Sequence, residues 1–122
     1  MKDRRSEYDV TDDVHLNNAN SVHDAVVTIF RNAFSKFNEA ALKQAFEDCE
    51  RLFEGDYPTY QPCDTLYHDK QHTMDMTLAL ARLINGHERS VARSERLGAD
   101  RAVIAVITAL YHDSGYIRHE HD

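Results

Sequence analysis

The stretch "NEAALKQAFEDCERLFEG" (Asn38 to Gly55) shows most clearly what kind of fold the chain adopts. Its apolar residues recur at spacings of three and four, which places them on one face of an α-helix. These residues are Ala41, Leu42, Ala45, Phe46, Cys49, Leu52 and Phe53. Asn38 is a suitable N-cap and Gly55 a suitable stop. The stretch therefore predicts an amphipathic helix that packs one side against other helices.

The same period continues on both sides of this stretch. Val22, Val26, Ile29, Phe30, Ala33 and Phe37 form a similar stripe. We predict helices near 18–36, 39–54, 66–84 and 100–113. No segment shows the clean alternation of a strand, so the predicted fold class is all-α, a helical bundle of at least four helices.

Short polar signals set the predicted helix ends. Asn20 or Ser21 can cap the first helix, and Asp100 can cap the last. Asn85-Gly86 and Ser114-Gly115 are expected to end the third and fourth helices. The segment 56–65 holds both prolines and is expected to be a loop, while the charged segment 87–98 is a short helix or a connector.

Composition narrows the class of protein. The 122 residues suit one domain, with a flexible polar arm over 1–17 and a helical domain over 18–122. The net charge of −7 argues against a nucleic-acid partner. The most apolar run, "AVIAVITALY", is too short to cross a membrane, and two cysteines make no disulfide framework. We expect a cytoplasmic protein with no membrane partner.

Two segments carry residues suited to chemistry. "YHDKQH" (Tyr67 to His72) places His68 and His72 one helical turn apart, with Asp75 a turn beyond. Forty residues later His112-Asp113 ends an apolar helix that we expect to be buried on most sides. A carboxylate there is costly unless a cation or donor meets it. Imidazole and carboxylate are also the ligands that a divalent metal takes in proteins.

These segments resemble those of the HD-domain metal-dependent phosphohydrolases. "YHDKQHTMDMTLALARLI" is similar to the Tyr-His-Asn-x-x-His-x-x-Asp-Val segment of cyclic nucleotide phosphodiesterases. Four residues match it: Tyr67, His68, His72 and Asp75. Asp69 replaces the Asn of that segment, and Met76 replaces its Val. "LYHDSGY" (Leu110 to Tyr116) resembles the second segment, a His-Asp pair after apolar residues.

The resemblance implies a role for each matching residue. His72, His112 and Asp113 would bind a divalent metal ion (Mn, Mg, Zn, Fe or Ni), and Asp113 would also take part in catalysis. His68 would be the acid that protonates the leaving oxygen, and Asp75 would orient a ligand histidine. Lys70 could contact a phosphate, although we expect it to be solvated. The implied function is hydrolysis of a nucleotide or another small phosphoester by a metal-activated water.

The chain departs from the family where the last metal ligand is expected. In the family this ligand is an aspartate on a later helix, whereas only nine residues follow Asp113 here. We expect a C-terminally truncated chain that hydrolyses phosphoesters poorly or not at all. Two alternatives remain: a non-catalytic HD-like regulatory or binding module, and a site completed by the tail "HEHD" (His119 to Asp122). An iron-based oxygenase is a third, weaker idea. The apolar last helix also makes a homodimer conceivable, formed by helix exchange.

Overall fold

Four α-helices account for almost all of the chain that the structure describes. A computed structural model describes the backbone of residues 18–55 and 64–120, and the side chains of residues 18–53 and 70–112. The elements are α1 (Ala19–Ala33), α2 (Glu39–Gly55), α3 (Asp64–Ser90), the 3-10 turn η1 (Arg93–Glu95) and α4 (Ala99–Glu120). The described segments contain no strand, so the prediction of an all-α fold is confirmed. The predicted arm and most of the predicted loop, 1–17 and 56–63, lie outside them.

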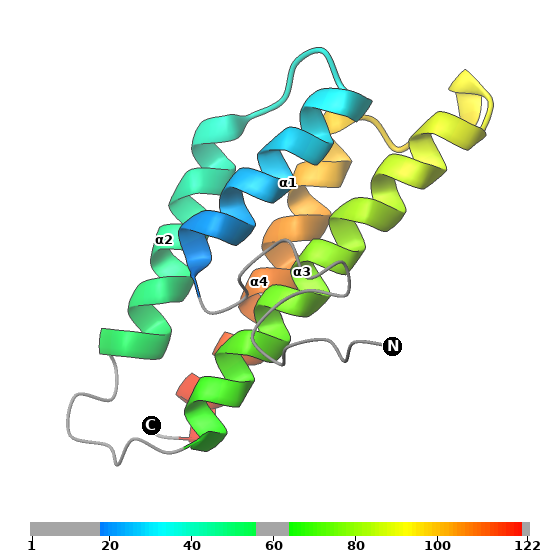
Figure 1. Ribbon diagram of the computed structural model, residues 1–122. Coiled ribbons are helices and arrows are strands. Elements are labelled where there is room, and N and C mark those ends of the chain that lie inside the picture. The colour runs from blue at the N-terminus through cyan, green and yellow to red at the C-terminus, as the bar shows by residue number, and fades with distance from the viewer. Residues whose placement is uncertain (1–17, 56–63, 121–122) are drawn as a thin grey trace, which may run out of the picture.

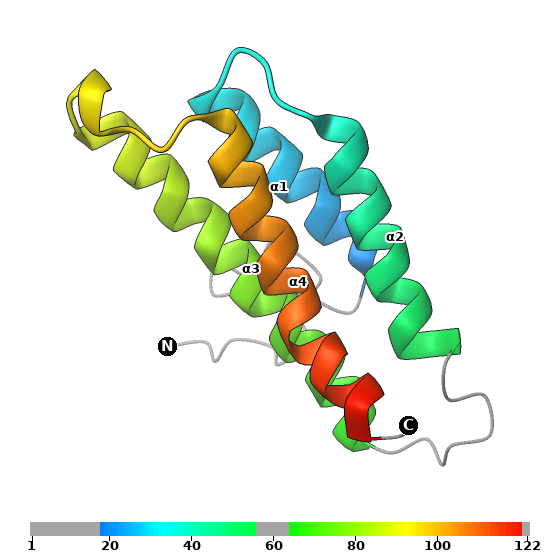
Figure 2. The ribbon, with the colours of Figure 1, turned by 180° about the vertical axis from the view of Figure 1, so that it is seen from behind.

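The helices alternate in direction and form a bundle (Figure 1). α1 packs against α2 and α3, and α4 packs against the same two helices from the other side, as both views show (Figures 1 and 2). The consecutive pairs α1–α2 and α3–α4 are antiparallel. The bundle thus consists of two helical hairpins placed side by side. α1 is parallel to its neighbour α3, and α2 is parallel to its neighbour α4.

The core contains the stripes that the periodicity predicts. Val22, Val26 and Phe30 of α1 are fully enclosed, as are Leu42 and Cys49 of α2. The other two helices contribute Met74, Leu78, Ala81, Ile84, Ala102, Val103, Val106 and Leu110. Burying each large apolar side chain stabilises the fold by about 1.5–3 kcal/mol before conformational entropy is counted.

Three predicted helix ends are wrong. α1 ends at Ala33 rather than near 36, because the backbone becomes extended at Phe34. α3 continues through Asn85-Gly86 to Ser90, and α4 continues through Ser114-Gly115 to Glu120. A glycine within a helix costs only about 1 kcal/mol, which packing further along can offset. In α3 that packing is visible, because Ile84 and Glu88 on either side of Gly86 are both buried.

The caps are partly as predicted. Asn38 accepts a hydrogen bond from the backbone N–H of Ala41 at 3.0 Å, so its role at the start of α2 is confirmed. α1 begins after Asn18 rather than after Asn20 or Ser21, and Asn18 Oδ1 accepts from both of those backbone N–H groups. Asp100 lies in the first turn of α4, and the N–H groups just before that helix bind the carboxylate of Glu88 instead.

α4 is less enclosed than its sequence suggests. Its buried residues form one face, whereas Ile104 on the other side is 61% exposed and Thr108 is also exposed. The expectation that this helix is buried on most sides therefore holds except along one row that α2 and α3 do not cover, Arg101, Ile104, Thr108 and His112. None of the described helices is long and apolar enough to cross a membrane.

Candidate functional site

The two segments with predicted site residues lie at the same end of the bundle. The first turns of α3 and the last turns of α4 run side by side in both views (Figures 1 and 2). α2 also ends at this end of the molecule (Figure 1). The antiparallel packing of α3 on α4 thus brings together segments that are some forty residues apart in sequence.

His72 and His112 both have exposed side chains. His72 precedes the buried pair Thr73 and Met74, so it lies on the outer side of α3. His112 lies two residues beyond the buried Leu110 and is on the outer side of α4. Asp75, one turn after His72, is half-buried.

The other predicted residues are described only as part of the helix backbone. His68 lies in the first turns of α3, and Asp113 lies in α4 three residues after Leu110. Among the side chains of 18–53 and 70–112, no three His, Cys, Asp or Glu residues lie close enough to hold a metal ion. Because two of the proposed participants fall outside those ranges, the convergence of His72, His112 and Asp113 stays a prediction.

Lys70 is held by an acidic residue of α2. Its Nζ lies 2.6 Å from Glu50 Oε1, and only 12% of the lysine side chain is exposed. The expectation of a solvated lysine is therefore wrong. A charge-assisted hydrogen bond of this length is among the stronger polar contacts in proteins. Glu50 therefore offsets part of the positive charge that Lys70 would present to a phosphate.

Asp48 of α2 is the centre of a polar cluster that sequence reasoning did not identify. Its carboxylate accepts hydrogen bonds from Tyr111 Oη at 3.1 Å and from Gln44 Nε2 at 2.9 Å, and it lies 3.6 Å from Arg51 Nη2. Burial and the hydrogen bond to Asp48 raise the pKa of the Tyr111 phenol. The available signal was that Asp48 and Glu50 flank Cys49 on the apolar face of α2, where each can reach a different neighbouring helix.

Cys49, between these two acids, is unsuited to nucleophilic chemistry. It is fully buried, and its Sγ donates to the backbone carbonyl of Leu110 at 3.7 Å. Burial, together with the negative charge of Glu50, raises the pKa of the thiol to about 12, although Lys70 opposes the shift. The reactive thiolate is therefore not populated near neutral pH.

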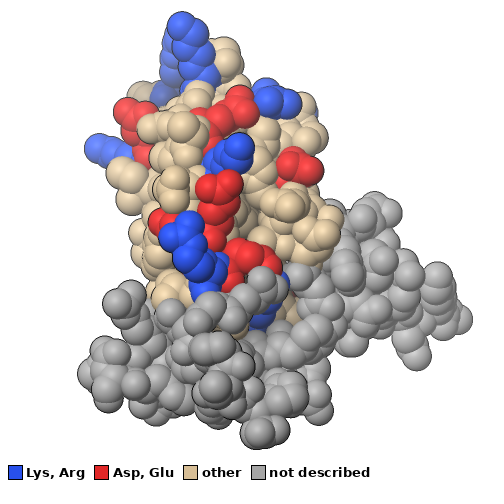
Figure 3. Space-filling view, turned by 90° about the vertical axis from the view of Figure 1, so that its left-hand side faces the viewer, with Lys and Arg blue, Asp and Glu red and all other residues tan. Residues whose placement is uncertain are grey.

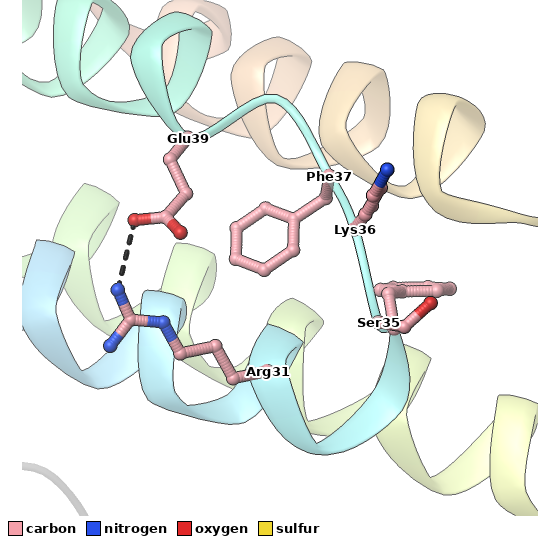
Figure 4. Close-up of a pocket in the computed structure, with 6 residues that line it drawn as sticks. Arg31, Ser35, Lys36, Phe37 and Glu39 are labelled. Atoms are coloured by element: carbon pink, nitrogen blue, oxygen red, sulfur yellow. Dashed lines mark hydrogen bonds and ion pairs between the residues drawn. The ribbon is translucent and has the colours of Figure 1, made fainter.

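A surface hollow of about 520 Å³ lies at the turn between α1 and α2. That turn is at the opposite end of the bundle from the ends of α3 and α4 that carry the predicted site (Figure 1). It is lined by Arg31, Phe34, Ser35, Lys36, Phe37 and Glu39. Arg31 reaches across it to Glu39 at 3.1 Å beside the ring of Phe37 (Figure 4). Both charged groups are well exposed, so this pair contributes little to stability.

Comparison with known proteins found no matching family model, no similar curated protein and no similar solved structure. The likeness to HD-domain phosphohydrolases therefore rests on the two sequence segments alone.

Proposed function

We propose that the protein is a metal-dependent phosphohydrolase acting on a nucleotide or another small phosphoester. The observation that supports this most is the packing of α3 against α4, with the start of one beside the end of the other. A site assembled from "YHDKQH" and "LYHDSGY" requires that neighbourhood. A bundle with these two ends apart would have excluded it.

In this proposal the chain supplies both the metal ligands and the acid. His72, His112 and Asp113 bind the ion, and His68 donates a proton to the leaving oxygen. Asp75 orients an imidazole ligand through its second nitrogen. A bound divalent ion would supply a water of lowered pKa and would offset phosphoryl charge. A positioned general acid typically contributes about 10²- to 10⁴-fold in rate.

A second candidate is a non-catalytic helical module that binds a partner without turnover. The contact between Lys70 and Glu50 favours this second candidate, because Lys70, the residue predicted to contact a phosphate, already binds Glu50. The Asp48 cluster also ties α2 to α4 through Tyr111. Polar side chains at this end of the bundle therefore have clear structural roles.

Metal affinity separates the two candidates. We expect the wild-type chain to bind Mn²⁺ in isothermal titration calorimetry, and His72→Ala and His112→Ala each to weaken binding at least about tenfold, the lower limit for residues that merely support a ligand. His87→Gln is the matched control, since His87 lies on α3 about 22 Å further along the helix axis. Its affinity should equal that of wild type.

Hydrolysis is measured on the same proteins with bis(p-nitrophenyl) phosphate and common nucleotides. We expect slow Mn²⁺-dependent turnover that is lost in His72→Ala and retained in His87→Gln. If the wild-type chain binds no Mn²⁺ at millimolar concentration, the proposal of a phosphohydrolase is overturned and the non-catalytic binding module is the remaining candidate. Binding that is equal in all four proteins would place the metal elsewhere.

A further inference from the structure

The outer face of α3 carries no Asp, Glu, Lys or Arg side chain along its central row. We call this row the α3 stripe; it consists of His72, Met76, Ala79, Leu83 and Gly86, all exposed. The spacing alternates between four and three, the pattern by which two helices pack along a common seam. The outer row of α2 is the opposite case: Glu39, Lys43, Glu47 and Arg51 are all exposed and alternate in charge. Acidic and basic side chains are accordingly intermixed on the side of the molecule where α2 lies (Figure 3).

Two large apolar side chains of the α3 stripe are unusually open to solvent. Met76 is 54% exposed and Leu83 is 71% exposed. They lie opposite the face that buries Met74, Thr77, Leu78 and Ala81. A helix at a protein surface normally has one apolar face, whereas α3 has two. The second apolar face is the kind of surface that an interaction covers.

We infer that the α3 stripe pairs with the α3 stripe of a second copy, in antiparallel orientation about a two-fold axis near Ala79. Met76 and Leu83 are seven residues apart and are centred within one residue of Ala79. Antiparallel pairing on that centre places Met76 against the second copy's Leu83, and Leu83 against its Met76. Such an interface is isologous, because the same patch is used by both copies.

The charges beside the stripe fit this pairing and favour a second copy over another occupant. Asp75 and Arg82 each precede one of the two large apolar residues, so both flank the stripe on the same side. Both are half-buried. They too are seven residues apart, and they are likewise centred within one residue of Ala79. In the antiparallel pair Asp75 faces the second copy's Arg82, and Arg82 faces its Asp75, which gives two attractive contacts.

A parallel arrangement of the two helices lacks these attractive contacts. In a parallel pair, a two-fold axis along the helices would place the Asp75 and Arg82 of the two copies on opposite sides of the seam, so the two attractive contacts would not form. The exposed Ile104 of α4 follows the exposed Arg101 by one turn, so that face is not free of charge in the same way. A contact along one helix lies at the small end of stable interfaces, so we expect a dissociation constant in the micromolar range, on the order of 10 µM.

Sedimentation equilibrium across about 1–300 µM chain at physiological ionic strength tests the pairing, a range that spans the expected constant. We expect a monomer–dimer equilibrium for wild type. Leu83→Glu should weaken it at least about tenfold, since it places a charge in the seam. Ile104→Glu is the matched control, because Ile104 is a similarly exposed apolar residue on α4 and should leave the equilibrium unchanged. Circular dichroism confirms that both variants keep their helices.

Charge exchange tests the orientation. Asp75→Arg and Arg82→Asp should each weaken self-association, and an equimolar mixture of the two should form a heterodimer, because opposite charges then meet at both contacts. The double variant should recover the wild-type equilibrium. A wild-type chain that stays monomeric throughout the concentration range would overturn the inference. So would a dimer that survives Leu83→Glu but not Ile104→Glu, or a charge-exchange mixture that gains nothing. The readout is oligomeric state alone, so it does not depend on whether the protein is a phosphohydrolase.

Discussion

Glu88 is a buried acid with a specific structural task. Its side chain is only 3% exposed, and its two oxygens accept from the backbone N–H groups of Leu97 at 2.9 Å and Gly98 at 3.1 Å. Desolvation raises the pKa of this carboxyl, but the two hydrogen bonds and the electrostatic effects of His87 and Arg96 outweigh it, so the pKa is lowered overall. Glu88 thereby fixes the connection between α3 and α4.

Replacing Glu88 with Gln should destabilise the protein by about 1–3 kcal/mol at neutral pH, because the amide cannot accept both hydrogen bonds as a carboxylate does. A lowered pKa in the folded state stabilises the fold above the unfolded-state pKa of about 4.3, and this contribution is lost as pH falls through the folded-state pKa. Urea unfolding between about pH 7 and pH 3 should therefore show the two proteins converging as the pH falls. A constant difference in unfolding free energy would contradict the role of the charge.

At the scale of elements, two glycines of the α3–α4 hairpin have opposite roles. Gly86 lies within α3, and a Cβ at this position would meet no atom within 4 Å. Gly98 precedes α4 with a φ of +88°, in the left-handed region that side chains other than glycine rarely adopt. The sequence suggested Gly86 as a helix end and gave no sign that Gly98 is the glycine with the left-handed backbone.

We predict that Gly86→Ala stabilises the protein by about 0.5–1 kcal/mol, since alanine loses less backbone freedom on forming a helix. Gly98→Ala should destabilise it by about 1–2 kcal/mol, because it forces a Cβ into a left-handed backbone. Both are measured by urea unfolding at low micromolar protein, where self-association through α3 is minor. Destabilisation by both substitutions would mean that α3 does not continue through Gly86, and stabilisation by both would mean that Gly98 does not need a left-handed backbone.

For the whole molecule, stability depends on which face of each helix the bundle encloses. α3 provides a comparison within one helix: Leu78 is fully buried, whereas Leu83 is 71% exposed. Leu78→Ala should cost about 2–5 kcal/mol through lost burial and the cavity that remains. Leu83→Ala should change stability by less than about 0.5 kcal/mol at protein concentrations where the monomer dominates.

The total stability of a domain of this kind is about 5–15 kcal/mol, so the first substitution removes a large share and the second almost none. Urea unfolding at low micromolar concentration compares the two directly. Equal costs would show that the outer face of α3 is covered within the single chain, and would also argue against its use as a contact between copies.

The sequence by itself determined the fold class, the buried stripes of α1 and α2, and the N-cap at Asn38. These follow from interactions between residues three or four apart, which a helix imposes wherever it forms. The histidine pair, the His-Asp pair and their resemblance to HD-domain phosphohydrolase segments were also visible in the sequence. Their convergence on a metal ion stays a prediction, because His68 and Asp113 lie outside the described side chains.

Only the tertiary structure decided where α3 and α4 end and which partners the polar residues take. Glu88 binds Leu97 and Gly98 across a turn, Lys70 binds Glu50 from another helix, and Tyr111 binds Asp48 over 63 residues of sequence. The choice between the two apolar faces of α3 also came from packing. Local periodicity offers both faces, and the bundle buries only the one that its neighbours reach. Such choices depend on contacts between segments that are distant in sequence, and the spacing of neighbouring residues does not specify those contacts.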